Sequence, residues 1–278
     1  MQKPLKRLSR EGHDLLQLIG IYCTVTCRFW RWRFSLWFQQ FRRVESSQTL
    51  MKQTLLIIRH GQTTWNVEHR LPGQLPGVAL NENGRQQAAR LAEALSVLPI
   101  SAIISSPLER AYVTATYVGQ KRDVGIQLEP DLMDTNVGPW AGEVIQELAK
   151  KDPAWSAYVR DPTVAPEGIE TFPQVQQRVV AAVERWRTQD GIGPYPAFVA
   201  HADVVKLLVA HYTGLDARKA GSLIIDNASV SLVELEDEQP PRVLSIGWSP
   251  HPGWLKSPSI PEILKKDKPE EVVGEQKT

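Results

Sequence analysis

The sequence predicts an α/β fold, arranged as a three-layer α/β/α sandwich with a mostly parallel central sheet. Between residue 51 and about residue 255, strand-like stretches alternate with stretches whose apolar residues recur at helical spacing. This alternation is typical of α/β proteins. Two of the strand-like stretches, residues 55–58 and 197–200, are apolar throughout. Such strands lie inside a parallel sheet that helices cover on both faces.

The individual elements follow from apolar spacing and from residues that start or stop helices. Pro99 ends the first predicted helix, and Ser106 is the predicted cap of the second, with Pro107 in its first turn. The last two strands are expected to be antiparallel, at an edge of the sheet. We expect helices at residues 81–98, 106–118, 171–187 and 203–212, and strands at 55–58, 102–105, 197–201, 229–235 and 243–248.

The first strand ends in residues that are suited to binding and attacking a phosphate group. Arg59, His60 and Gly61 follow it directly, and ligands of open α/β sheets bind just beyond the carboxyl ends of the strands. Arg59 offers a planar fork of donors that matches phosphate oxygens, and Gly61 lets the backbone approach a ligand. Asn66 adds an amide donor about one turn later. His60 is then the group that can act as a nucleophile.

Further segments repeat this pattern and suggest a family. His201 ends the strand at residues 197–201, and Arg110 follows the strand at 102–105. With these segments, residues 51–248 resemble the histidine phosphatase superfamily, in the branch that also contains cofactor-dependent phosphoglycerate mutase. The resemblance rests on Arg59-His60-Gly61 with Gln62, Thr63 and Asn66 at the family spacing, on Ser106-Pro107-Leu108-Glu109-Arg110-Ala111, on Val199-Ala200-His201-Ala202 and on Gly138-Pro139-Trp140-Ala141-Gly142.

The resemblance implies roles for individual residues. It makes His60 the nucleophile that forms a phosphohistidine, Asp134 the acid that protonates the leaving group, and His201 a further catalytic residue. The substrate-binding residues that it implies are Arg59, Gly61, Asn66, Arg110 and Ala202.

The chain departs from the family pattern at two positions. Asp134 is one methylene shorter than the glutamate that is usual at its position, and Ala141 stands where a second glutamate is common. Glu129 and Glu143 are alternative candidates for the acid. The change at Ala141 bears on substrate choice rather than on the chemistry.

The residue types favour the same chemistry. Phosphoryl transfer needs positioning and positive charge around the phosphate oxygens, which Arg59, Arg110 and a protonated His201 would supply. The same cations are expected to lower the pKa of His60 and keep one ring nitrogen unprotonated. We expect a metal-independent phosphatase that uses no cofactor and acts on a small phosphorylated metabolite. The alternatives are a cofactor-dependent phosphoglycerate mutase and a catalytically inactive phosphate-binding protein.

Charge and cysteine content bound the remaining possibilities. Residues 1–50 hold nine Lys and Arg against three Asp and Glu, whereas the whole chain has a net charge of +1. The rest is therefore mildly acidic, which argues against binding nucleic acid. Cys23 and Cys27 both lie in the first 50 residues, so we expect no disulfide in the remainder and a cytoplasmic enzyme. His69 and His211 are interpreted as structural or surface residues.

The two ends of the chain differ in composition from residues 51–255, which are expected to form the histidine phosphatase domain. Residues 256–278 are predicted to be a disordered tail. Residues 1–50 form a basic, aromatic extension that we expect to lie outside the fold, and its apolar stretch at 15–27 is shorter than the ~20 residues that span a bilayer. The favoured interpretation is that residues 1–50 result from a translation start assigned upstream of the true one, or that they form a flexible extension. The alternative is a helix lying on an anionic membrane through an aromatic face made by Trp30, Phe34, Trp37, Phe38 and Phe41.

Overall fold

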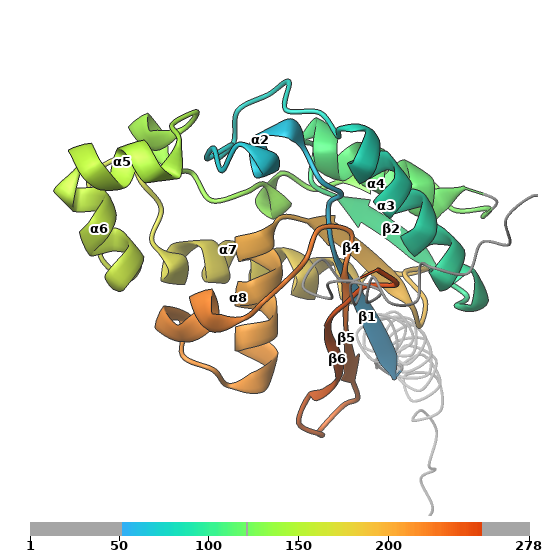
Figure 1. The fold of residues 1–278 in the computed structure, drawn as a ribbon. Coiled ribbons are helices and arrows are strands. Elements are labelled where there is room, and N and C mark those ends of the chain that lie inside the picture. The colour runs from blue at the N-terminus through green and yellow to red at the C-terminus, as the bar shows by residue number, and fades with distance from the viewer. Residues whose placement is uncertain (1–51, 121, 252–278) are drawn as a thin grey trace, which may run out of the picture. The chain divides into compact units, whose positions relative to one another are not determined.

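The computed structural model describes residues 52–120 and 122–251, and these form a six-stranded sheet with the strand order β3-β2-β4-β1-β5-β6 (Figure 1). The strands are β1 (Gln53–Arg59), β2 (Ala102–Ser105), β3 (Ile126–Leu128), β4 (Pro196–Ala200), β5 (Val230–Leu235) and β6 (Arg242–Trp248). Strands β1 to β4 all run parallel to one another, whereas β5 is antiparallel to both β1 and β6. The predicted α/β class, the mostly parallel sheet and the antiparallel late strands are confirmed.

Helices cover both faces of this sheet. They are α2 (Thr64–Val67), α3 (Glu82–Ala94), α4 (Glu109–Gly119), α5 (Ile145–Lys151), α6 (Pro153–Arg160), α7 (Phe172–Arg187) and α8 (Ala202–Thr213), with short 3-10 helices at Leu95–Val97, Pro130–Leu132, Gly138–Trp140 and Ala217–Ser222. In β1, Leu55 and Ile57 pack with α7 and α8, while Leu56 and Ile58 pack with α3 and α4 (Figure 1). All four side chains are fully buried, and each contributes about 1.5–3 kcal/mol of transfer free energy.

Side-chain caps are present at the starts of α3 and α7. The Asn81 side chain accepts a hydrogen bond of 2.7 Å from the Gly84 N–H at the start of α3. Thr171 and Gln174 form a reciprocal capping box at the start of α7. These caps satisfy N–H groups that have no partner within the helix.

The predicted start of α4 is wrong, because the helix begins at Glu109 with Leu108 as its N-cap. Ser106 donates its backbone N–H to the Val199 carbonyl at 2.9 Å, so it remains tied to β4. Its hydroxyl lies 2.9 Å from the His201 ring. The Ser106 side chain therefore contacts the residue after β4 and does not cap α4.

The loop after β1 is pressed against the first turn of α3. A Cβ atom on Gly61 would lie 2.4 Å from the Gly84 carbonyl oxygen, and a Cβ on Gly84 would lie 2.0 Å from that of Gln62. Both distances are too short for any side chain to be tolerated without movement of the backbone. The two glycines thus fix the position of the loop that carries His60.

No helix among residues 52–120 and 122–251 is long and apolar enough to cross a membrane. The predictions for the extension at residues 1–50 and for the tail at 256–278 concern parts of the chain outside the described residues.

A chain that begins at Met51 should fold as the full chain does, because every described element begins at Gln53 or later. We expect the two melting temperatures, followed by circular dichroism, to agree within about 4 °C, which corresponds to roughly 1 kcal/mol at this size. Loss of cooperative unfolding on truncation would instead assign residues 1–50 to the domain. Co-sedimentation of the full chain with anionic vesicles tests the membrane alternative separately.

Candidate active site

Two histidines meet at the carboxyl ends of β1 and β4. These strands are adjacent and parallel, with Arg59 paired to Ala200, so His60 and His201 leave the sheet at the same edge. Their ring centroids are 5.2 Å apart and the rings are tilted by 60°. Both residues are almost completely buried. The sheet register thus brings together two residues that are far apart in sequence.

His60 presents an unprotonated nitrogen to the site. Its Nδ1 lies 2.7 Å from the Gly61 carbonyl oxygen, and a carbonyl only accepts, so Nδ1 carries the proton and Nε2 carries the lone pair. Burial, followed by the charges of Arg110 and Arg59, lowers the pKa of His60 well below its usual range. The predicted direction is confirmed, although burial rather than neighbouring charge is the largest cause.

His201 is held by the Ser106 hydroxyl, whose Oγ lies 2.9 Å from Nε2. Oγ also accepts a longer bond, 3.3 Å, from the Leu108 N–H, so its own hydrogen is available to His201 Nε2. When the hydroxyl donates to Nε2, the ring proton lies on Nδ1, which is buried and has no hydrogen-bond partner. The nearest carboxylate oxygen, on Asp134, is 3.7 Å away, which is too far for a hydrogen bond.

The predicted positive charge on His201 is not what these surroundings favour. Burial, followed by the positive charge of Arg110 and by His60, lowers the pKa of His201 well below its usual range. The ring is therefore neutral at pH 7. A bound phosphate dianion would act in the opposite direction, by stabilising the protonated ring.

The two arginines add further buried donors. Arg110 is 1% exposed and donates from one Nη to the Gly73 carbonyl at 2.7 Å and to Asp134 at 3.2 Å. Arg59 donates from Nη1 to the Ile225 carbonyl at 2.6 Å. The Nε atoms of both arginines are buried without a partner. Because buried polar groups are rarely left unpaired, these two Nε donors and His201 Nδ1 point to an anionic ligand with several acceptor oxygens.

Asp134 carries a carboxyl group that is easily protonated. Burial raises its pKa to about 6, and the charge of Asp203 acts in the same direction, while Arg110 acts against them. The Thr135 N–H donates to its Oδ1 at 3.0 Å. A carboxyl group with a pKa near the working pH is well suited to general acid catalysis.

The alternative acids lie elsewhere. Glu129 binds Arg185 and the Trp186 ring N–H at 2.7 and 2.6 Å, and Glu143 forms an ion pair with Lys151 at 2.6 Å. Neither lines the pocket that contains His60.

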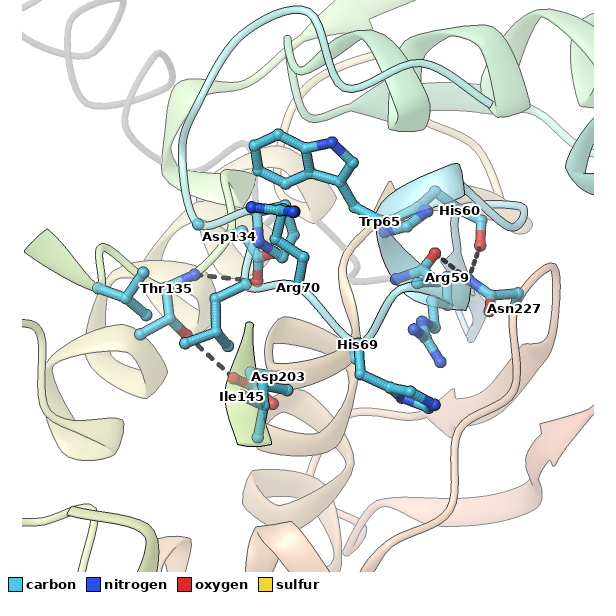
Figure 2. A pocket seen from close by; sticks show the side chains of 16 residues that line it. Arg59, His60, Trp65, His69, Arg70, Asp134, Thr135, Ile145, Asp203 and Asn227 are labelled. Atoms are coloured by element: carbon cyan, nitrogen blue, oxygen red, sulfur yellow. Dashed lines mark hydrogen bonds between the residues drawn. The ribbon is translucent and has the colours of Figure 1, made fainter. Parts of the chain in front are cut away.

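This pocket has a volume of about 320 Å³. Figure 2 shows Asp134, Thr135 and Asp203 along one side of it and Arg59, His60 and Asn227 along the other. Arg110 and His201 are not among the residues that line this cavity. Its full lining is Arg59, His60, Trp65, Asn66, His69, Arg70, Leu71, Pro72, Gly73, Asp134, Thr135, Val137, Ile145, Ala202, Asp203 and Asn227.

The other predicted binding residues differ in how they reach the pocket. Asn66 lines it, and its side-chain oxygen is occupied by the Thr63 N–H and by Asn227, which leaves its NH2 group as the donor. Ala202 also lines it, as the first residue of α8, and helix N-termini attract anions. Gly61 is different, because its N–H donates to Thr114 Oγ1 at 3.0 Å. Its contribution is to orient His60 and to pack against α3.

Several residues of the site were not identified from the sequence. His69 was interpreted as structural or surface, but it lines the pocket, in a left-handed conformation (φ 52°). Ser106 and Asp203 were not singled out as site residues, although Ser106 is the first residue of the motif at 106–111 and Asp203 directly follows the motif at 199–202. Among the described residues there is no group of three or more His, Cys, Asp and Glu that would hold a metal ion.

The model of the histidine phosphatase superfamily (branch 1) matches residues 55–248 of the chain. The chain belongs to the histidine phosphatase superfamily. Among curated relatives, phosphoserine phosphatase 1 of Hydrogenobacter thermophilus is 29% identical over 187 residues, covering 66% of this chain and 88% of the relative. A probable phosphoglycerate mutase of Shigella boydii is 34% identical over 195 residues, covering 69% and 88%.

Solved structures of histidine phosphatases have the same fold. A mycobacterial glucosyl-3-phosphoglycerate phosphatase in complex with VO3 is 30% identical, with a TM-score of 0.63, over 71% of this chain and 98% of that one. A putative alpha-ribazole-5'-P phosphatase from Escherichia coli is 26% identical, with a TM-score of 0.64, over 70% and 96%. The similar proteins therefore include both phosphatases and a probable mutase.

Replacing Ser106 with Ala should remove the partner of His201 Nε2 and let the ring proton distribute between both nitrogens. We expect inorganic phosphate to bind roughly 3- to 10-fold more weakly, as for the loss of one neutral hydrogen bond. Nitrogen NMR reports the tautomer, and calorimetry reports the affinity. The exposed Ser222, which bonds to Lys219, is a matched control. An unchanged tautomer in Ser106→Ala would contradict this role of the hydroxyl.

Proposed function

We propose that this histidine phosphatase is a metal-independent enzyme that hydrolyses small phosphomonoesters through a phosphohistidine on His60. The observation that carries the proposal is that buried nitrogen atoms of Arg59, Arg110 and His201 have no partner, while His60, whose ring lies 5.2 Å from that of His201, keeps a lone pair on Nε2. Donors held in place before the substrate arrives stabilise charge that develops on phosphate oxygens.

In the first step, His60 Nε2 attacks the phosphorus atom and the bond to the ester oxygen breaks. Arg59 and Arg110 bind the phosphate oxygens and balance their charge, and His201 Nδ1 donates a further hydrogen bond. The protonated carboxyl group of Asp134 transfers its proton to the departing alkoxide. The products of this step are the free alcohol, a phosphohistidine and the carboxylate of Asp134.

In the second step, a water molecule attacks the phosphorus atom of the phosphohistidine. Asp134 takes a proton from this water as the bond to Nε2 breaks, which regenerates the carboxylic acid, the neutral His60 and inorganic phosphate. Dividing one displacement into two lowers the barrier of each. Because the arginines already supply positive charge around the phosphate, no metal ion is needed in this sequence.

Phosphoglycerate mutase activity is a second candidate, supported by the 34% identity to the probable mutase of Shigella boydii. Assaying 3-phosphoglycerate with and without 2,3-bisphosphoglycerate separates the two functions. Release of inorganic phosphate that does not depend on the bisphosphate supports the phosphatase, whereas isomerisation that depends on it supports the mutase.

Replacing His60 with Ala should abolish turnover, because the group that forms the covalent intermediate is lost. Label from a 32P-phosphomonoester should be trapped on the wild-type protein in an acid-labile form and be absent from the variant. His211→Ala is a matched control, since His211 is exposed on α8 and lies outside the pocket. Labelling that persists in His60→Ala would refute the proposed nucleophile, and an unlabelled, inactive wild type would favour a phosphate-binding protein.

Replacing Asp134 with Asn should lower kcat by roughly 10²–10⁴-fold for alkyl phosphates, the usual effect of general acid catalysis. The loss should be smaller for p-nitrophenyl phosphate, whose leaving group departs without a proton. Asp134→Glu should retain substantial activity. Because the raised pKa of Asp134, about 6, keeps the acid form at lower pH, kcat/KM for alkyl phosphates should fall as the pH rises above that value. Equal losses for both substrates in Asp134→Asn would assign Asp134 to binding instead.

A further inference from the structure

Asp203 offers the pocket a carboxylate whose oxygens are only weakly occupied. It is the second residue of α8, directly after Ala202, and its side chain is 33% exposed. One oxygen is 3.4 Å from Thr135 Oγ1 and the other is 3.7 Å from Lys206 Nζ. Both distances are longer than a normal hydrogen bond of this type, so the carboxylate retains capacity to accept a stronger one. In Figure 2 it lies on the same side of the pocket as Asp134 and Thr135.

Arg70, another charged side chain in the lining, is already engaged. Arg70 donates from Nε to Glu68 at 3.2 Å and from Nη1 to the Gly142 carbonyl at 2.6 Å. Its guanidinium also lies over the Trp65 ring, 5.6 Å from the centroid. The carboxylate of Asp203 is therefore the less engaged charge of the two.

The pocket is consequently polarised. Arg59 and the first residue of α8, Ala202, line the part that suits an anion, and Arg110 lies buried behind it, bonded to Gly73 and Asp134. Asp203 adds a carboxylate to the wall that also holds Asp134. A phosphate group suits the part lined by Arg59 and Ala202. The part of the substrate that extends from it then meets a hydrogen-bond acceptor, in a cavity of about 320 Å³ that is near the lower end for small-molecule sites.

We infer that Asp203 selects phosphomonoesters whose alcohol part carries a hydrogen-bond donor, an ammonium or hydroxyl group, and disfavours those that carry a carboxylate. This inference rests on the proposed phosphate site and names its substrate class: phosphate esters of small amino alcohols and polyols, rather than of hydroxy acids. An ammonium group gains a charge-assisted bond to Asp203, whereas a carboxylate would meet a like charge.

The test compares the binding of phosphoethanolamine, glycerol phosphate and 3-phosphoglycerate by calorimetry, in the full chain with His60→Ala so that no ligand is consumed. Phosphoethanolamine should bind roughly 10-fold more tightly than 3-phosphoglycerate, the lower end for a charge-assisted bond because Asp203 is partly exposed. Glycerol phosphate should lie between them. Adding Asp203→Asn should bring the ratio of the two dissociation constants close to one.

Two further variants test whether the binding preference depends on the charge at Asp203. Lys206→Met removes the cation that faces Asp203 and should widen the preference, whereas Asp237→Asn, in the exposed turn between β5 and β6, removes the same charge at a distance and should leave it unchanged. A preference that survives Asp203→Asn, or no binding of any of these ligands, would overturn the inference. This binding test does not depend on turnover. A wild type that binds selectively but releases no phosphate would refute the proposed phosphatase activity. A wild type that releases phosphate but lacks the binding preference would refute the role of Asp203.

Discussion

Parallel pairing of β1 with β4 holds two histidines, 141 positions apart in the chain, at one edge of the sheet. Residues 55–58 of β1 and all of β4 are buried, so a shift of register by one residue would turn Leu55 and Ile57 toward the wrong layer. The same burial that fixes the register also fixes the 5.2 Å separation of the two rings. The active site therefore depends on the hydrophobic layers above and below it.

The site combines buried cations with buried polar atoms that have no partner in the protein. Each buried donor without a partner costs about 1–3 kcal/mol of folding free energy. Two such donors, the Nε groups of Arg59 and Arg110, and the buried Nδ1 of His201 have no partner. An anion with several oxygens would offset the cost that these atoms place on folding. The neutral state of both histidines follows from the same surroundings, because burial and nearby arginines disfavour a further positive charge.

The motifs allowed much of this arrangement to be predicted from the sequence. Apolar strands that end in His60 and His201 indicated both the α/β class and the edge where a ligand would bind. Ser106 was missed as a partner of His201, because a serine before a proline also fits a helix cap and the competing contact comes from a distant strand. The lowered pKa of His201 in the site without phosphate is not indicated by the sequence, because its largest cause is burial in the folded protein.

Elements that lack a strong local pattern were also missed. The strand β3 has three residues, two of them exposed, and α5 and α6 are only seven and eight residues long. Their conformation is determined by packing in the folded protein rather than by periodicity. Asp203 belongs to the same category, since its relation to Thr135 and Lys206 depends on how α8 meets the loop after Met133.

The contact between Gly61 and Gly84 has a consequence for engineering the enzyme. Gly84 lies in the first turn of α3, where replacing a helical glycine by alanine ordinarily adds up to about 1 kcal/mol of helix stability. Here the added methyl group would meet the carbonyl of Gln62 and push the loop that holds the nucleophile. A substitution that a stability screen would select on helix propensity alone would thus misalign His60, without touching the substrate or any charged residue.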